Sequence, residues 1–595
     1  MLKMFKILPK QLKKQLFLGI CLVLLNVILT MFIPILIAQF LPLLIEKEEL
    51  YKIVLFNIEV YKTSSFSNAL VLLLGLTVSL IIVSSVISIT SLLLIVWAGE
   101  KASNFYRDTL FKKYQLLSLK DIAHFTPESL ITRINDDVAV FWDFLVSAST
   151  SLVKAPFYII AGLVFAFLTD VNLTFSIIAV IPLLVLVMGL IFKKVRPLIS
   201  KNRKNLDAIT KESDENILGI RFIKAYNLQN QQYKKFKNIN TKWKNTEISV
   251  FNLFSAAMPS FFFIVNLVVV FIYTTAYLMI QNQPDLDHAQ LVAKINTFIE
   301  YEFIIAIGIT TFSQFLGTFF RARVSSKRVI DVIETKYDDL LVLNGLNLSN
   351  DPNYSIEFKN FNFKYFDTSE DYVLKDINFK IPDGHTLGII GPTGSGKSTI
   401  ANLLVNNMKY NDGNILIENK EVKEINSKQL RENIGIVYQD SLLYSGTIKS
   451  NLLFAKTNAN EDEIQKAINN ACANSFINSF PDKLDHIIGQ RGKNLSGGQK
   501  QRLSIARTLL INPKILILDD STSALDNITT KNLIQNIKNN YNTTNIIISQ
   551  KINSIKHADN IIVLDKGRII AQGTHQELIK NCPWYQDVNN NQLEQ

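Results

Sequence analysis

The stretch Gly391-Pro-Thr-Gly-Ser-Gly-Lys-Ser-Thr399 decides the fold of the second half of this 595-residue chain. It matches the phosphate-loop pattern G-x-x-x-x-G-K-[ST] in full. The apolar run Leu387–Ile390 precedes it and the helical run Ile400–Asn406 follows it. This strand–loop–helix context is the one that the pattern requires. The sequence therefore predicts an α/β P-loop domain that binds a nucleoside triphosphate.

The chemistry of a phosphate site explains these residue types. Glycines let successive backbone N–H groups curl around a phosphate, and the helix N-terminus adds a partial positive charge. Lys397 can reach the β- and γ-phosphates, and the Ser398 hydroxyl can bind Mg²⁺. The loop residues expected to bind ATP are Gly391, Thr393, Gly394, Ser395, Gly396, Lys397, Ser398 and Thr399.

A second element of the same site lies downstream. Ile515–Asp519 is a short apolar run that ends in a carboxylate. This is the Walker B arrangement, which holds Mg²⁺ beside a phosphate loop. A lone strand of this kind would be weak support, but after a phosphate loop it is specific. We expect Asp519 and Ser398 to hold Mg²⁺ together.

Long apolar runs fill roughly the first 320 residues of the chain. Six of them are long enough to cross a bilayer as helices, which takes about 20 residues each. We place these segments at about 17–45, 69–98, 144–169, 172–193, 250–280 and 295–319. The first run is about twice as long as the apolar core of a signal peptide and no small-residue cleavage site follows it, so we expect it to be retained.

The loops between these segments alternate in charge. The N-terminus, Lys101–Arg133 and Lys193–Lys244 are rich in Lys and Arg. Glu46–Glu49, Asp170–Asn172 and Gln281–Ala289 are not. Because cytoplasmic loops carry the basic residues of membrane proteins, we expect a multi-pass protein of the cytoplasmic membrane with both termini in the cytoplasm. The net charge of +11 then reflects topology and not binding of nucleic acid.

Two features of the membrane half have alternative readings. Phe125–Val138 and Glu215–Asn227, in the long basic loops, are amphipathic; they are either solvated helices or coupling helices that carry motion from the ATPase to the membrane. Lys154, Glu300 and Glu302 are ionisable residues in apolar segments. We expect Lys154 to snorkel to the membrane surface, and the two glutamates either to lie in the outer interface or to attract a cationic substrate.

Leu495-Ser-Gly-Gly-Gln499, continued by Lys-Gln-Arg-Leu-Ser-Ile-Ala-Arg507, resembles the signature motif of the ABC (ATP-binding cassette) transporters. The order of the motifs is also similar to that family. The stretch GIRFIKAYN and the six membrane segments resemble the ABC exporters in which the membrane domain is fused ahead of the ATPase. The resemblance covers nearly the whole chain. It implies a membrane α-helical domain followed by an α/β P-loop cassette, acting in ATP-driven export.

The resemblance also implies roles for single residues. Tyr365 looks like the aromatic residue that stacks on adenine. Gln439 looks like the Q-loop glutamine, which senses the γ-phosphate and contributes to the Mg²⁺ site. Ser523–Asp526 looks like the D-loop, and Asn560–His575 has the closing pattern of the family.

The signature implies a dimer. In this family two cassettes pair head to tail, and each ATP lies between the phosphate loop of one chain and the signature of the other. The residues expected to bind the partner's ATP are Ser496, Gly497, Gly498 and Gln499. They form a second backbone nest at a helix N-terminus. One cassette cannot use both nests on one ATP.

Two positions depart from the family pattern. After Asp519 the family has Glu, which orients or activates the attacking water, but this chain has Asp520. In the switch region the family has His, but this chain has Gln550. Aspartate retracts the carboxylate by roughly 1.5 Å, and misplacement on this scale can cost about 100-fold in rate. Glutamine can hydrogen-bond a phosphate but cannot carry a proton or a positive charge as histidine can.

The sequence thus predicts a membrane domain over residues 1–335, a linker over 336–353 and a nucleotide-binding domain over 354–595. The expected function is export of an amphiphilic drug, lipid or peptide, with ATP and Mg²⁺ as cofactors. Asp520, Gln550 and Gln439 are the candidate catalytic residues. The paired departures favour one chain of a heterodimer whose own site is degenerate. A homodimeric exporter and a non-transporting regulator of a partner membrane protein are the alternatives.

Overall fold

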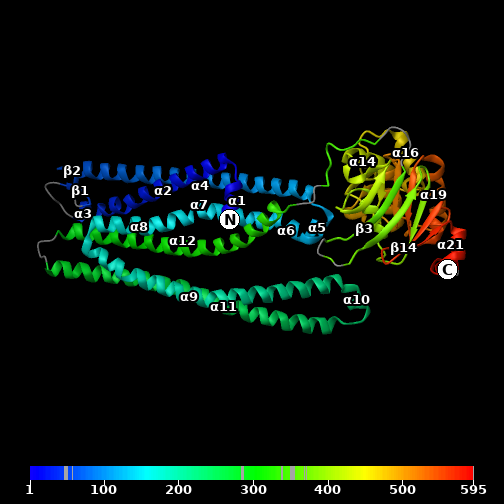
Figure 1. Ribbon diagram of the computed structural model, residues 1–595. Helices are drawn as coiled ribbons and strands as arrows, with labels where there is room; N and C mark the ends of the chain where they lie inside the picture. Colours follow the sequence, from blue (N-terminus) through cyan, green and yellow to red (C-terminus); the bar gives the residue numbers. More distant parts are fainter. Residues whose placement is uncertain are drawn as a thin grey trace. The chain divides into compact units, whose positions relative to one another are not determined.

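The computed structural model describes residues 1–45, 51–56, 58–282, 287–336, 340–348, 355–366, 369 and 371–593 (Figure 1). It divides into two compact units. The first comprises Met1–Lys113 and Glu128–Thr335, and the second comprises Tyr114–Pro127 and Lys336–Gln595. The expected acidic loop Glu46–Glu49 and the residue Asp285 lie outside the described residues.

In the residues that are described, the first unit is helical apart from one hairpin. Its elements are α1 (Leu2–Ile7), α2 (Lys10–Ala38), α3 (Phe40–Ile45), β1 (Tyr51–Leu55), β2 (Ile58–Thr63), α4 (Phe66–Leu116), α6 (Pro127–Thr132), the π-helix η1 (Arg133–Asp137), α7 (Val138–Ser149), α8 (Ser151–Thr169), α9 (Val171–Leu218), α10 (Ile220–Ala225), α11 (Gln229–Asn282) and α12 (His288–Glu334). The antiparallel β1–β2 hairpin was not predicted.

Five helical stretches among the described residues are long and apolar enough to cross a membrane: Lys10–Ile45, Phe66–Leu116, Pro127–Thr169, Gln229–Asn282 and His288–Glu334. Each contains one of the predicted segments. The remaining segment, 172–193, falls within α9, where several side chains lie outside the described positions. Helix α4 has 51 residues, so at 1.5 Å per residue it spans roughly 75 Å. It therefore extends far beyond a hydrocarbon core of about 30 Å.

Small residues let the membrane helices approach closely, as is common where apolar burial alone cannot drive association. A Cβ at Gly308 on α12 would lie 2.9 Å from the Ala155 carbonyl on α8, and a Cβ at Gly162 would lie 2.7 Å from the Ile305 side chain. Polar contacts add to this packing. The Tyr301 hydroxyl donates to the Met31 carbonyl over 3.1 Å.

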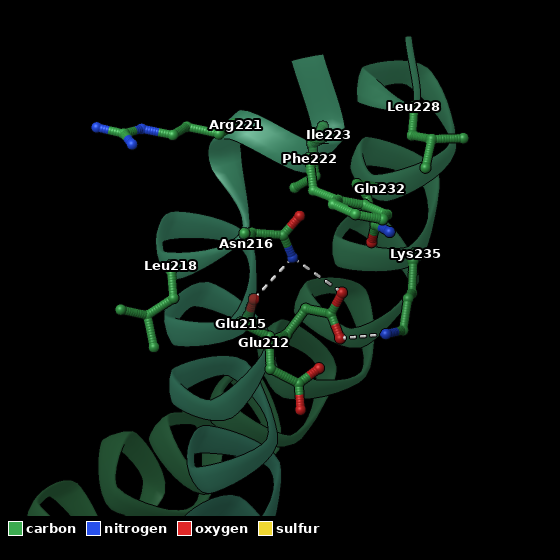
Figure 2. Close-up of a pocket in the computed structure, with 11 residues that line it drawn as sticks. Glu212, Glu215, Asn216, Leu218, Arg221, Phe222, Ile223, Leu228, Gln232 and Lys235 are labelled. Atoms are coloured by element: carbon green, nitrogen blue, oxygen red, sulfur yellow. Dashed lines mark hydrogen bonds and ion pairs between the residues drawn. The ribbon is translucent and has the colours of Figure 1, made fainter. Parts of the chain in front are cut away.

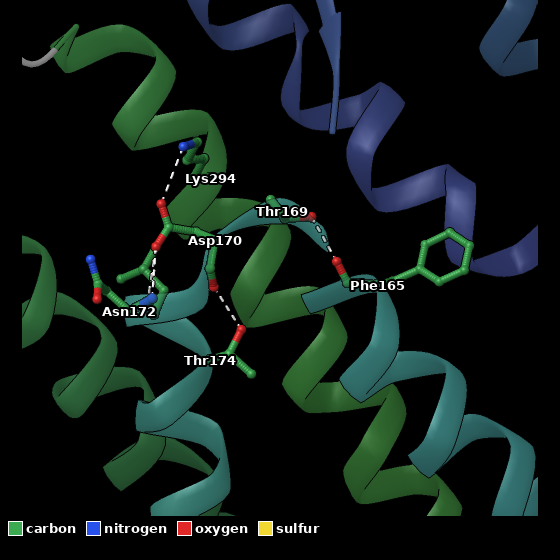
Figure 3. Close-up of polar contacts among 7 residues, drawn as sticks. Phe165, Thr169, Asp170, Asn172, Thr174 and Lys294 are labelled. Atoms are coloured by element: carbon green, nitrogen blue, oxygen red, sulfur yellow. Dashed lines mark hydrogen bonds and ion pairs between the residues drawn. The ribbon is translucent and has the colours of Figure 1, made fainter. Parts of the chain in front are cut away.

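Helices α9 and α11 lie side by side as a long hairpin with α10 at its tip (Figure 1). At the other end, the turn between α8 and α9 consists of Asp170 alone. Its carboxylate accepts hydrogen bonds from the backbone N–H groups of Asn172 and Leu173, which caps α9, and pairs with Lys294 of α12 over 3.2 Å (Figure 3). One carboxylate therefore starts α9 and ties it to α12.

Within the described residues the second unit holds three sheets, one of which is the small antiparallel pair β9–β10. A six-stranded sheet has the order β14-β13-β5-β12-β11-β8, and all its pairs are parallel except β13–β14. A four-stranded antiparallel sheet has the order β4-β3-β6-β7. The strand bounds are β3 Ile356–Phe363, β4 Leu374–Ile381, β5 Thr386–Ile390, β6 Asp412–Ile417, β7 Lys420–Glu421, β8 Ile434–Val437, β9 Gly446–Thr447, β10 Ile487–Ile488, β11 Ile515–Asp519, β12 Thr544–Ile548, β13 Asn560–Asp565 and β14 Arg568–Gly573.

The helices of this unit include α13, which begins at Lys397 of the phosphate loop, and α18, which begins within the signature. Their bounds are α5 Leu119–Phe125, α13 Lys397–Leu404, α14 Ser427–Asn433, α15 Ile448–Leu453, α16 Glu461–Asn470, α17 Asn474–Asn478, α18 Gly497–Leu509, α19 Asn527–Asn540, α20 Ile552–Ile555, α21 His575–Asn581 and α22 Pro583–Leu593. The parallel strands β5, β12 and β11 are neighbours. Because carboxyl ends of parallel strands meet at one edge, the segments that follow these three strands form one site.

Two segments differ in placement from the sequence reading. The segment of the first basic loop that belongs with the cassette unit is Tyr114–Pro127, which contains α5 and lies mostly before the predicted stretch Phe125–Val138. Within the predicted linker, the described residues 340–348 pack on the second unit. The backbone N–H of Val342 donates to the Ser427 hydroxyl, and that of Leu346 to the Glu424 carbonyl, each over 2.8 Å.

Candidate functional site

A cavity of about 300 Å³ lies where β5, β12 and β11 end. Its walls bring together the phosphate loop, the Walker B strand, the Q-loop position and the switch segment, although these are far apart in the sequence. The residues around it are Tyr365, Val373, Thr393, Gly394, Gly396, Lys397, Ser398, Thr399, Gln439, Asp519, Asp520, Ile548, Ser549 and Gln550.

The phosphate loop has the backbone that its glycines allow. Gly394 has φ +82° and Gly396 has φ +103°, a region that side chains disfavour. A Cβ at Gly391 would lie 2.0 Å from the Leu564 carbonyl oxygen, so this position requires glycine. Ser395 is buried and its hydroxyl has no hydrogen-bond partner among the described residues.

Lys397, the first residue of α13, is buried beneath this loop. Its ammonium donates to the carbonyls of Gly391 and Pro392, each over 2.8 Å. Burial lowers the pKa of Lys397, while Asp520 and Asp519 act in the opposite direction. A phosphate group would compete with the two carbonyls and would favour the charged ammonium.

Ser398 and Asp519 meet as a Mg²⁺ site requires. The Ser398 hydroxyl donates to the Asp519 carboxylate over 2.9 Å. Burial raises the pKa of Asp519, and the hydrogen bond from Ser398 partly offsets this. A hydroxyl and a carboxylate are hard oxygen ligands that suit Mg²⁺. Within the described residues no group of three or more His, Cys, Asp or Glu side chains could hold a metal ion, so a Mg²⁺ here would take further ligands from phosphate and water.

Asp520 is half-buried and contacts one other candidate catalytic residue. The Gln439 side-chain amide donates to its carboxylate over 3.2 Å. The Asp520 backbone N–H donates to the Ile548 carbonyl over 2.9 Å, and Gln550 lines the same cavity. Burial raises the pKa of Asp520, while the Gln550 N–H and Lys397 act in the opposite direction.

Tyr365 lies at the edge of the cavity, 40% exposed. Its hydroxyl and that of Thr399 share a hydrogen bond of 2.9 Å. Its ring packs edge-on against Phe363 with centroids 5.2 Å apart. The open face and the fixed ring suit stacking on a base.

The signature residues lie apart from this cavity. Ser496 caps α18 in a capping box: its hydroxyl accepts the Gln499 backbone N–H, and the Gln499 side chain accepts the Ser496 N–H. Gly497 opens the helix. A Cβ at Gly498 would lie 3.0 Å from the Ala524 carbonyl, which explains the glycine. The signature residues therefore do not share a cavity with the phosphate loop of the same cassette.

Two polar residues that the sequence analysis did not assign hold the D-loop. The Gln501 side chain accepts the backbone N–H of Ala524 over 3.1 Å and donates to the Ser523 hydroxyl over 3.3 Å. The Lys551 ammonium donates to the carbonyls of Ser523 and Leu525, over 2.9 and 3.2 Å. Both residues contact a segment that is distant from them in the chain. A single sequence carries no local pattern that predicts such contacts.

A second cavity, of about 510 Å³, lies in the membrane unit at the tip of the α9–α11 hairpin (Figure 2). Glu212 pairs with Lys235 over 2.8 Å and accepts from the Asn216 amide over 3.0 Å. Around this polar centre the apolar side chains face outward: Leu218 is 87% exposed and Phe222 66% exposed. This tip lies within the predicted amphipathic stretch Glu215–Asn227.

Comparisons with known proteins agree with this arrangement. Residues 374–523 match the family model described as ABC transporter, and residues 16–301 match the ABC transporter transmembrane region. A putative ABC transporter ATP-binding protein of Mycoplasma genitalium is 36% identical over 521 residues, covering 83% of this chain and 81% of that protein. The chain belongs to the ABC transporter family.

Within this ABC family, exporters are among the relatives. A putative multidrug export ATP-binding/permease protein of Staphylococcus aureus is 30% identical over 506 residues, covering 83% of this chain and 84% of that protein. The structure of a bacterial Atm1-family ABC exporter with ATP bound aligns with a TM-score of 0.74 and 22% identity over 98% of this chain and 99% of that one. The predicted fold class, a membrane helical domain followed by an ABC cassette, is confirmed.

The ATP-binding domain of the ABC family implies that the cavity binds ATP, typically with Mg²⁺. The geometry fits both. The glycine loop, Lys397 and the free Ser395 hydroxyl face the phosphates, and Ser398 with Asp519 faces the metal. The bound metal would neutralise charge on the phosphates. This chain's own residues would position the phosphate oxygens and, at Asp520, a water.

Proposed function

We propose that this ABC chain is one half of a heterodimeric, ATP-driven exporter of an amphiphilic drug, lipid or peptide. Its own ATP site is degenerate, and its signature completes the competent site of the partner chain. The proposal rests chiefly on one observation: Asp520 and Gln550, the two residues that depart from the family pattern, line the same cavity.

The position of Asp520 explains why its identity matters. Its carboxylate is already engaged by the Gln439 amide. A side chain one methylene shorter than glutamate holds the carboxylate closer to its own backbone, by roughly 1.5 Å, at a cost that can reach about 100-fold in rate. Gln550 cannot replace the proton or the charge of a histidine. Slow hydrolysis at this site follows.

The signature shows no such departure from the family pattern. Ser496 and Gln499 form a complete capping box at the start of α18, and Gly497 and Gly498 leave the backbone N–H groups accessible to a phosphate. The signature of this chain, which forms one side of the partner's ATP site, is therefore competent. An intact signature beside an altered hydrolytic centre is the asymmetry expected of a heterodimer.

The proposed membrane orientation has both termini in the cytoplasm. Helix α5 then couples the ATPase to the membrane domain, because it belongs to the cassette unit. The Lys120 ammonium of α5 lies over the Phe366 ring, 5.4 Å from its centroid, next to the proposed adenine platform Tyr365. The apolar tip formed by Leu218 and Phe222 is a second coupling element, suited to docking on a cassette.

Two substitutions in the assembled complex test the proposal. Lys397→Met removes the phosphate contact at this chain's own site, and Ser496→Arg blocks the signature that serves the partner's site. The proposal predicts that Ser496→Arg abolishes steady-state ATP hydrolysis and that Lys397→Met reduces it by less than about threefold, since slow turnover contributes little. Equal loss in both variants would indicate two equivalent sites and a homodimer.

Transport is tested in the same preparation. An exporter predicts that an amphiphilic substrate raises the ATPase rate of the complex reconstituted in lipid. A complex whose ATPase responds to no amphiphile, but whose nucleotide binding alters a co-purified membrane protein, would instead support the non-transporting regulator.

A further inference from the structure

A third cavity, of about 820 Å³, lies in the membrane unit between the helices α1, α2, α7 and α12. Its wall is apolar except for Ser149 and the basic side chains Lys3, Lys13 and Arg323. Among the described residues that line it, none is acidic. An apolar cavity with a few polar groups of one charge suits a ligand that has an anionic head and an apolar body.

Three phenylalanines place this cavity at one end of the membrane segments. Phe17 is the first residue of the first predicted segment, Phe144 is the first residue of the third, and Phe319 is the last residue of the sixth. All three line the cavity, and the rings of Phe144 and Phe319 pack with their centroids 6.3 Å apart. They form an aromatic wall at the level where the apolar segments end.

The basic residues lie just beyond that level. Lys13 precedes Phe17 by four residues on α2, and Arg323 follows Phe319 by four residues on α12. Four residues are about one helical turn, so each basic side chain lies on the same face as its phenylalanine and about 6 Å further along the helix. In the proposed orientation, with both termini in the cytoplasm, this is the height of the cytoplasmic head groups.

Two of the basic side chains carry charge that no carboxylate neutralises. Arg323 is exposed and forms no hydrogen bond or ion pair with any residue that the structure describes. The Lys13 ammonium donates to the Lys6 carbonyl over 2.8 Å, which leaves its charge in place. Lys3 differs, because it pairs with Glu334 over 2.7 Å. Arg323 and Lys13 are therefore available to an anionic group.

The wall that α1 contributes is held in place by the rest of the membrane unit. Met4 is fully buried, and the Tyr106 hydroxyl of α4 donates to the Met4 carbonyl over 2.5 Å. The pair between Lys3 and Glu334 ties the same helix to α12. The cavity is thus formed before a ligand enters, which lowers the entropic cost of binding.

We propose that this cavity binds an anionic phospholipid: the head-group phosphate lies against Arg323 and Lys13, and an acyl chain lies along the aromatic wall. Basic pockets between membrane helices on the cytoplasmic side attract anionic head groups. The net positive charge of the rim favours a lipid whose head group is anionic over a zwitterionic one. The inference concerns a site apart from the ATP cavity and depends neither on a heterodimer nor on export.

The test measures lipid binding to the full-length chain in a neutral detergent by native mass spectrometry. The probes are phosphatidylglycerol and phosphatidylcholine with identical acyl chains. Arg323→Gln removes the free charge, and Arg321→Gln is its control, because Arg321 is exposed on the same helix and does not line the cavity. Phe17→Ala shortens the aromatic wall, and Leu18→Ala is its control for the same reason on α2. All four side chains are exposed, so the fold should tolerate each change.

The proposal predicts that the wild-type chain binds phosphatidylglycerol at least about fivefold more tightly than phosphatidylcholine, and that high salt reduces this preference. Arg323→Gln should weaken binding of phosphatidylglycerol by about fivefold, the factor that one basic residue contributes near a membrane surface, and leave phosphatidylcholine unchanged. Phe17→Ala should weaken both lipids by about threefold, because it removes apolar contact. Both controls should bind as the wild type does.

Other results would overturn the proposal. Equal affinity of the wild-type chain for the two lipids, or an unchanged preference in Arg323→Gln, would contradict recognition of the head group. Equal weakening in Arg321→Gln would assign the preference to general surface charge. Unchanged lipid binding in Arg323→Gln and Phe17→Ala, together with loss of the dimer in size-exclusion chromatography, would show that a second chain covers this face. ATP binding, measured in the same preparations, tests the proposed function separately.

Discussion

The Gln439 amide donates a hydrogen bond to the Asp520 carboxylate over 3.2 Å. The Q-loop position and the residue after the Walker B strand are 81 positions apart in the chain, and their contact closes one side of the cavity. Gln550 lines the same cavity. Because Gln439 and Asp520 share a hydrogen bond, the effects of changes at these two residues should be coupled.

Tyr365 should contribute to ATP affinity through its ring. Tyr365→Ala is expected to weaken ATP binding about tenfold, because stacking of a base on an aromatic ring contributes about 1–3 kcal/mol. Tyr365→Phe keeps the ring and loses only the hydrogen bond to Thr399, so it should stay within about threefold of wild type. The measurement is equilibrium binding of ATP to the purified chain. Equal weakening in both variants would exclude stacking as the main contribution.

Ser398 should control the dependence on Mg²⁺. Ser398→Ala removes the hydroxyl that donates to Asp519, and it is expected to raise the Mg²⁺ concentration needed for tight ATP binding by about 10- to 100-fold. Ser398→Thr retains a hydroxyl and should behave as wild type. Titration of Mg²⁺ at fixed ATP measures the effect. An unchanged Mg²⁺ requirement in Ser398→Ala would place the metal elsewhere.

Asp520 should lower stability near neutral pH. Burial raises its pKa in the folded chain, so the folded state binds the proton more tightly than the unfolded state and the ionised form is disfavoured. Asp520→Asn is therefore expected to raise the thermal midpoint at pH 7.5, by about 2 °C. This gain should shrink as the pH is lowered through the folded-state pKa.

Asp526 provides the control for that pH dependence. Its pKa is lowered by hydrogen bonds from Thr529 at the start of α19, so its ionised form stabilises the fold above its ordinary pKa and this contribution is lost on acidification. Asp526→Asn should lower the midpoint at pH 7.5. Thermal unfolding of both variants at pH 7.5 and pH 5 checks the opposite signs. A gain in Asp520→Asn that is independent of pH would contradict the account.

Asp170 should stabilise the membrane domain in two separable ways (Figure 3). Asp170→Ala removes both the cap of α9 and the ion pair with Lys294, and loss of an N-cap alone costs about 1 kcal/mol. Asp170→Asn keeps the cap and removes the charge, and Lys294→Met removes only the pair. We expect the thermal midpoint in detergent to fall most in Asp170→Ala. Equal midpoints in Asp170→Ala and Asp170→Asn would show that the cap contributes nothing.

The cassette could be read from the sequence because its motifs are short and contiguous. Asp519 ends the apolar strand β11, and Gln550 lies two residues after the apolar strand β12; the parallel order β5-β12-β11 then brings both beside the phosphate loop. In contrast, the contacts of Gln501 and Lys551 join segments that are distant in the chain. Their side chains follow no periodicity, and so they became visible only in the folded structure.

The helices of the membrane half could be predicted from the sequence, whereas the segments that connect them were harder to predict. Apolar length is a strong signal for a spanning helix, whereas the β1–β2 hairpin has no glycine or proline at its turn, where Phe56 has φ 49°. Helix α5 was missed although Ser118 and Asp121 form a capping box at its start, because the amphipathic stretch that follows gave the stronger pattern. Turn chemistry and not hydropathy marks these elements.

The most direct test of the central claim is steady-state ATP hydrolysis by this chain purified alone in lipid, beside a variant that carries Asp520→Glu and Gln550→His. The account predicts that the native chain is nearly inactive and that the double substitution raises turnover toward the range of about 1–100 s⁻¹ found for kinases, which also transfer phosphoryl groups. A native chain that already hydrolyses ATP in that range would contradict the degenerate site and, with it, the heterodimer.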